Sequence, residues 1–118
     1  MIIKTIKDSN KLTLKIEGFF DCTEIIEYDK FLEEELPKND FNELIIDLSQ
    51  MEFIDSMGMG RLIILKKKML KDEKTMKIIN VSDDIKSIFK IHFLSVYYYL
   101  ALVTSRFRYH RHTEKDIH

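Results

Sequence analysis

The sequence predicts one α/β domain built on a mixed sheet, and three observations support this prediction. Apolar residues alternate with polar ones at 12–16, which is typical of a half-buried strand. An apolar segment at 44–48 is typical of a strand that is buried on both faces. Apolar residues at helical spacing follow that segment. The order is strand, strand, helix, strand, helix, strand, helix, so we expect crossover connections between parallel strands.

The first part of the chain predicts a hairpin and a helix. Residues 2–6 predict a first strand, and the polar residues 8–10 predict a turn into the second strand, which we expect to end at Gly18. Apolar residues then recur every three or four positions over 22–36, which predicts an amphipathic helix. Pro37 ends that helix, because its ring cannot continue it.

The second part of the chain predicts two more strand–helix units. We expect a short turn to join the central strand, 43–48, directly to a second helix. The predicted core stripe of that helix comprises Leu62, Leu65 and Met69. The next strand is expected to begin near Thr75, and the polar residues 82–84 predict the start of a last helix.

The start of the second helix carries an Asp-Ser pair and two glycines. Either Asp55 or Ser56 suits an N-cap, because its side-chain oxygen can accept from a free backbone N–H. Anions are favoured at such a place, so a serine there can carry a phosphate at low electrostatic cost. Gly58 and Gly60 indicate either tight packing of the helix on the sheet or close approach of a partner.

Two segments together resemble the signature of STAS domains, in particular the bacterial anti-sigma factor antagonists. They are residues 45–49, Ile-Ile-Asp-Leu-Ser, and residues 53–60, Phe-Ile-Asp-Ser-Met-Gly-Met-Gly. That family has a hydrophobic strand ending in Asp-Leu, a loop, and Asp-Ser-x-Gly-x-Gly at the start of a helix. The resemblance covers about residues 2–92. It implies a sheet of four to five strands with helices chiefly on one face.

The resemblance also implies a function. Ser56 would be phosphorylated by an anti-sigma factor that is itself a serine kinase. The unphosphorylated protein would bind that kinase and release the sigma factor, and a serine phosphatase would be a further partner. Asp21 matches an aspartate that the family places beside the phosphorylation loop, and it can equally cap the following helix. The expected partner-binding residues are Asp21, Asp55, Ser56, Met57, Gly58, Met59 and Gly60.

Composition sets limits on other functions. The net charge is −1, with an acidic half at 1–60 and a basic half at 61–118. No aromatic residues interleave with the lysines of the segment 61–77, as a nucleic-acid groove would require. The single cysteine, Cys22, excludes an internal disulfide and a cysteine-based zinc site. No apolar run is long enough to span a membrane, so we expect a cytoplasmic protein without metal or cofactor. Met57 and Met59 could contact a partner or pack in the core.

Two alternative functions stay open at this stage. The chain could be a STAS scaffold, either in a stress-signalling assembly or as a regulatory subunit of a lipid transporter. It could also be a small enzyme with Ser56 as nucleophile, although no glycine stands two residues before the serine. We expect a domain core at 1–92 and an atypical segment at 93–118, which could form a helix or a strand before a basic tail. The oligomeric state is left open.

Overall fold

The computed structural model describes residues 1–89 of the 118-residue chain. Its strands are β1 (Ile2–Asp8), β2 (Lys11–Phe20), β3 (Glu43–Asp47), β4 (Met51–Ile54) and β5 (Thr75–Ile79). Its labelled helices are η1 (Cys22–Glu24), α1 (Ile25–Glu35), η2 (Leu36–Lys38) and α2 (Ser56–Lys71). A further helix spans residues 83–89.

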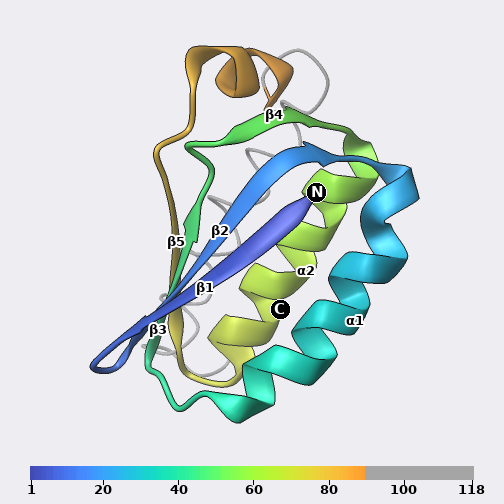
Figure 1. The fold of residues 1–118 in the computed structure, drawn as a ribbon. Helices are drawn as coiled ribbons and strands as arrows, with labels where there is room; N and C mark the ends of the chain where they lie inside the picture. The colour runs from blue at the N-terminus through green and yellow to red at the C-terminus, as the bar shows by residue number, and fades with distance from the viewer. Residues whose placement is uncertain (90–118) are drawn as a thin grey trace, which may run out of the picture.

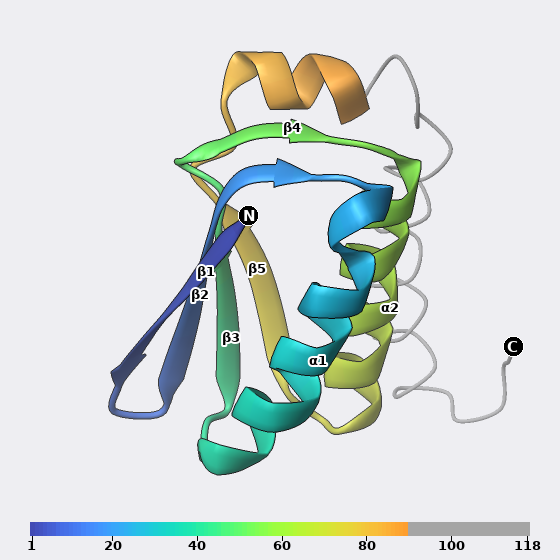
Figure 2. The ribbon, with the colours of Figure 1, turned by 45° about the vertical axis from the view of Figure 1, so that its right-hand side comes forward.

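The sheet is mixed, as the sequence predicts. The order is β1-β2-β3-β5, and β4 pairs with β2. β1 and β2 form an antiparallel hairpin, whereas β2 with β3, β2 with β4 and β3 with β5 run parallel. α1 and α2 lie together on one face of the sheet, and the helix at 83–89 lies beyond β4 (Figures 1 and 2). The predicted α/β class with helices chiefly on one face is confirmed.

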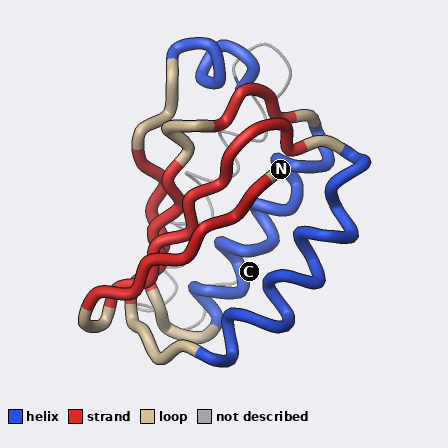
Figure 3. The backbone as a smooth tube through the Cα atoms, in the orientation of Figure 1, coloured by secondary structure: helices blue, strands red, loops and turns tan. Residues whose placement is uncertain are grey.

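β2 does not end at Gly18, so that prediction is wrong. Gly18 has φ +91°, a conformation that costs little only for glycine. The register shifts between Gly18 and Phe19, and the strand continues to Phe20 with β4 as its new neighbour in place of β3 (Figure 3). Gly18 therefore redirects β2 within the sheet, and this carries the chain to the start of α1.

A strand also stands where the sequence predicts only a short turn. Residues 51–54 form β4, which pairs with the far end of β2. Met51 and Ile54 are buried, but the residues between them are exposed, so the segment lacks the alternation that identifies a strand. Its pairing depends on a partner more than 30 positions earlier in the chain.

The core lies between the helices and one face of the sheet. On β2, Leu12, Leu14 and Ile16 point into it and are fully buried, and the predicted stripe of α2 is buried as well. β3 is buried on one face only, because no helix of residues 1–89 covers the other face, where Ile45 is only half-buried. The prediction of a strand buried on both faces is therefore wrong.

The last described helix begins as the sequence predicts. Ser82 caps it, since its Oγ accepts from the N–H of Ile85 at 3.1 Å. Ile85 and Phe89 are buried in the core. The expectations for Ile91, for His92 and for the segment 93–118 lie outside the described residues. Within residues 1–89 there is no helix long and apolar enough to cross a bilayer.

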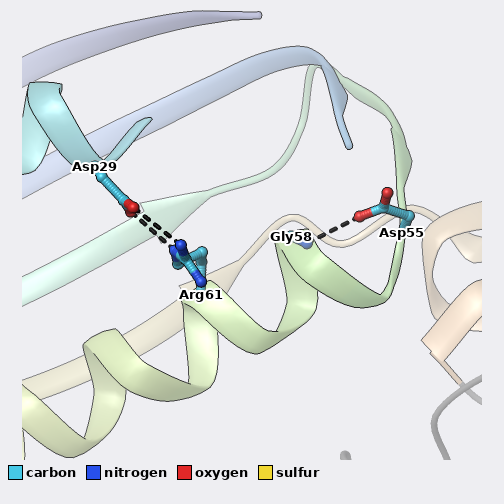
Figure 4. A network of polar contacts seen from close by, with 4 residues as sticks. All are labelled: Asp29, Asp55, Gly58 and Arg61. Atoms are coloured by element: carbon cyan, nitrogen blue, oxygen red, sulfur yellow. Dashed lines mark hydrogen bonds and ion pairs between the residues drawn. The ribbon is translucent and has the colours of Figure 1, made fainter. Parts of the chain in front are cut away.

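Two interactions join the helices to each other and to the sheet. Arg61 on α2 makes a bidentate contact with Asp29 on α1, at 2.9 Å from Nε to Oδ1 and 3.0 Å from Nη2 to Oδ2 (Figure 4). Tyr28 on α1 packs on Phe20, with ring centroids 4.6 Å apart. Its hydroxyl is buried and has no hydrogen-bond partner among the described residues.

Replacing Tyr28 by Phe is expected to raise the free energy of unfolding by about 1 kcal/mol, because a buried hydroxyl without a partner costs stability. Burial also raises the pKa of Tyr28 above its ordinary 10.0. The phenol then ionises in the unfolded chain before it does so in the folded one. The free energy of unfolding of wild type should therefore fall as the pH rises above the ordinary tyrosine pKa of 10.0. Urea unfolding should show a smaller fall in the free energy of unfolding between pH 7 and about pH 10.5 for Tyr28→Phe than for wild type. An equal fall in both proteins would contradict this.

Candidate functional site

The candidate site is the start of α2, where β4 ends and the helix begins. Ser56 is the first residue of α2, and Asp55 is its N-cap, with φ −104° and ψ −173°. The Oδ1 of Asp55 accepts from the N–H of Gly58 at 2.9 Å (Figure 4). Of the two capping candidates, Asp55 takes the role and Ser56 is left exposed to solvent. The hydroxyl that the predicted switch requires is thus accessible in the fold.

The second oxygen of Asp55 reaches another part of the chain. Its Oδ2 accepts from the backbone N–H of Cys22 at 2.9 Å, at the start of η1. The backbone N–H of Asp55 also donates to the carbonyl of Phe20 at 3.2 Å. One carboxylate therefore holds together two helix starts that are 33 residues apart in sequence. No residue pattern predicts the Cys22 contact, because the donor is a backbone group.

Asp21 lies in the segment that Asp55 holds. It is the N-cap of η1, and its Oδ1 accepts from the backbone N–H of Thr23 at 3.0 Å and from the Thr23 hydroxyl at 2.5 Å. The hydroxyl contact is the main reason why the pKa of Asp21 lies below its ordinary 3.8. Asp21 therefore carries a negative charge at neutral pH. The structure brings the Asp21 turn and the Asp55–Ser56 turn together, as the predicted site requires.

The two glycines of α2 have different surroundings. A Cβ atom on Gly58 would collide with the carbonyl oxygen of Phe20 and would lie 2.9 Å from Cγ1 of Ile54. Gly58 is therefore required for close packing of the helix start on the sheet, one of the two interpretations left open above. A Cβ atom on Gly60 would meet nothing within 4 Å, so this packing does not explain that residue.

The apolar residues around the serine differ in how exposed their side chains are. Met59 is 3% exposed and Ile54 is fully buried, so both pack in the core. The side chain of Met59 is therefore not on the surface that a partner would touch. Met57 is 45% exposed and follows Ser56 directly, so its side chain is available for contact. Sequence reasoning did not identify Phe19 and Phe53, which are exposed next to this site on β2 and β4.

Residues 1–89 contain no histidine that could act as a base for the serine. All four histidines of the chain follow residue 89 in the sequence. The nearest carboxylate in sequence, Asp55, is engaged with two backbone amides. Within the described residues, the start of α2 is thus an exposed hydroxyl on a rigid turn, with two carboxylates in the adjoining turns.

This α/β domain, with an exposed serine at the start of its second helix, belongs to a recognisable family. A family model described as the STAS domain matches residues 2–98, so the chain belongs to the STAS domain family. A search of curated protein sequences found no match.

Solved structures share the fold at low sequence identity. One is described as the anti-sigma factor antagonist SpoIIAA in its unphosphorylated form, with 12% identity and TM-score 0.60, covering 75% of this chain and 82% of that one. The phosphorylated form of the Bacillus cell fate determinant SpoIIAA gives 13% identity, TM-score 0.60, and coverage of 80% and 86%. A structure described as Mglu gives 11% identity and TM-score 0.55 over 64% of this chain, but the match spans only 18% of that longer chain. At these identities the likeness establishes the fold alone.

The two glycines make a matched pair for a stability experiment. Gly58→Ala is expected to lower the free energy of unfolding by about 1–3 kcal/mol, because the added methyl group collides with the backbone of β2. Gly60→Ala should leave stability unchanged or raise it by up to about 1 kcal/mol, because alanine favours the helix and has room. Urea denaturation of the two variants measures both effects. Equal losses would contradict the packing assigned to Gly58.

Asp55→Asn tests the double contact of the carboxylate. An asparagine has one acceptor oxygen, so only one of the two backbone amides, Gly58 or Cys22, can keep its partner. We expect hydrogen exchange at the other amide to accelerate and the free energy of unfolding to fall by about 1 kcal/mol. Unchanged exchange at both amides, followed by NMR, would contradict the link between the two helix starts.

Proposed function

We propose that the protein is an anti-sigma factor antagonist that is switched by phosphorylation of Ser56. The observation that carries the proposal is the exposed hydroxyl of Ser56 at the first position of α2, within an Asp-Ser-x-Gly-x-Gly segment. Membership of the STAS family and the fold shared with SpoIIAA support it. In this proposal the unphosphorylated protein binds an anti-sigma factor and so releases the sigma factor. The protein acts by binding, in the cytoplasm, and not as an enzyme.

The partner would supply the chemistry of phosphorylation. The Oγ of Ser56 attacks the γ-phosphorus of ATP held by the kinase, the bond from that phosphorus to the bridging oxygen breaks, and ADP leaves. A base of the kinase takes the hydroxyl proton, since residues 1–89 contain no histidine. The rigid Asp55 cap holds the serine in place for this attack. A serine phosphatase would restore the hydroxyl.

The phosphate would act on the interface and not on the fold. It adds about −1.5 to −2 charges. At the start of α2 the helix dipole favours this charge, so we expect the modified protein to stay folded. At a partner interface the same charge would have to lose its water beside the carboxylates of Asp21 and Asp55, which disfavours binding.

Phosphosite mapping tests the assignment of Ser56. Wild type, Ser56→Ala and a control, Ser9→Ala, are incubated with ATP and a lysate of the organism that encodes the chain. Ser9 is also exposed but lies in the β1–β2 turn, at the other end of the strand. We expect phosphate on wild type and on Ser9→Ala, and none on Ser56→Ala. Equal phosphorylation of Ser56→Ala would contradict the site.

Binding of a phosphate mimic tests the switch separately. Ser56→Asp is expected to bind the kinase that modifies Ser56 at least about tenfold more weakly than wild type, because it brings a third carboxylate to the interface. Ser56→Ala should bind like wild type, since it adds no charge. Affinities can be measured by surface plasmon resonance with the purified kinase. Equal affinity of Ser56→Asp and wild type would reject the electrostatic part of the proposal.

A further inference from the structure

Two phenylalanine side chains form an exposed pair next to the candidate site. Phe19 on β2 is 51% exposed and Phe53 on β4 is 37% exposed. They are register partners in the parallel pairing of these strands, and their ring centroids are 6.1 Å apart. Single exposed apolar residues are common on soluble proteins, but two phenylalanines in contact with each other on the surface are not.

The fold places this aromatic pair close to Ser56. One residue after Phe19, the carbonyl of Phe20 accepts from the N–H of Asp55. Asp55 is two residues after Phe53 and immediately precedes Ser56. The pair and the serine therefore occupy neighbouring positions on the same two chain segments, so one bound protein can cover both.

Neither ring is required for the core. The inward positions of these strand ends are filled by Phe20 and Ile54, which are both fully buried. Phe19 faces outward by the regular alternation of β2, and the register shift, which leaves Glu52 of β4 without a partner, places Phe53 opposite it. The rings stabilise each other as a cross-strand pair, but about half of Phe19 and a third of Phe53 stay exposed as apolar surface that a partner can cover.

The charged side chains next to the pair in sequence are negative, and the N-terminal ammonium near Gly18 is paired with Glu24 at 3.6 Å. The chain has no lysine or arginine from residue 16 to residue 29 or from residue 39 to residue 60. These two stretches include Asp21, Glu52 and Asp55, which adjoin the two rings in sequence. The helix at 83–89, beyond β4, adds two aspartates and one lysine, Lys86. A partner surface that covers the pair would therefore be stabilised by basic groups around an apolar centre.

We propose that Phe19 and Phe53 are the anchor of the partner-binding surface, and that the partner segment covering them has an apolar or aromatic side chain flanked by arginine or lysine. This inference rests on the proposed function, because it takes that partner to be the protein that also meets Ser56. The basic groups of the partner lie over the aromatic pair, so a phosphate on Ser56 would lose its water at the same interface without a basic group opposite it. The surface and the switch are therefore compatible.

Selection of peptides tests the surface without a known partner. A library of random 12-residue peptides displayed on phage is selected on the full wild-type chain. The enriched peptides are then synthesised, and their binding is measured by fluorescence anisotropy. We expect them to combine an aromatic or aliphatic residue with arginine or lysine, and to bind more weakly at high salt. Enrichment of nothing, or of peptides without this combination, would overturn the proposal.

Variants then locate the bound peptide. Phe19→Ser and Phe53→Ser should each weaken binding about tenfold or more, whereas Ile26→Ser, which changes an 82% exposed residue on α1, should leave it within about twofold. Glu52→Lys reverses one charge and leaves both rings in place, so it should also weaken binding even if a serine variant proves unstable. Equal binding to Glu52→Lys and wild type would overturn the basic flank. A wild-type dimer in sedimentation that Phe19→Ser dissociates would assign the pair to a second copy and also overturn the proposal.

The outcome is separable from that of the proposed function. Peptide binding requires no phosphorylation, so it is measured on the unmodified chain whatever the phosphosite mapping shows. If the peptides bind the aromatic pair but no kinase modifies the protein, the binding surface is supported and the phosphorylation switch is contradicted. If Ser56 is phosphorylated but the peptides bind the Phe19 and Phe53 variants as well as wild type, the switch is supported and the binding surface is contradicted.

Discussion

The carboxylate of Asp55 is the contact on which the rest of the site depends. One oxygen caps α2 through Gly58, and the other accepts from Cys22 at the start of η1. Each contact alone is an ordinary helix cap. Together they fix the position of two turns that the sheet brings to the same end of the domain. Because Asp55 takes the capping role, Ser56 is free to point into solvent.

The bulge at Gly18 creates the surroundings in which this contact can form. β2 pairs with β3 up to Lys15 and with β4 from Gly18 to Phe20, so its end lies beside the segment that leads into α2. Gly58 has a related role, because only a residue without a side chain lets the start of α2 approach the end of β2 so closely. The two glycines therefore shape one site from opposite sides, although they are 40 positions apart in the chain.

The acidic and aromatic character of this end of the domain is separate from its stability. The core consists of apolar side chains, and within the described residues no charged side chain is buried. The exposed aromatic pair can thus be altered without opening the core, whereas Asp55 also caps α2. This separation is consistent with the proposed function, because a new charge at the surface does not disturb the interior.

Local patterns in the sequence determined the fold class, most of the helices and strands, and the Asp-Ser start of α2, because a cap and an amphipathic stripe each depend on residues close together in the chain. Only the tertiary structure decided that residues 51–54 form a strand, that β3 has an open face and that Met59 packs in the core. It also decided which carboxylate meets Cys22 and that Phe19 touches Phe53. These features arise from contacts between residues more than 30 positions apart or from which face the helices cover. The periodicity of a single segment predicts neither such distant contacts nor the face that the helices cover.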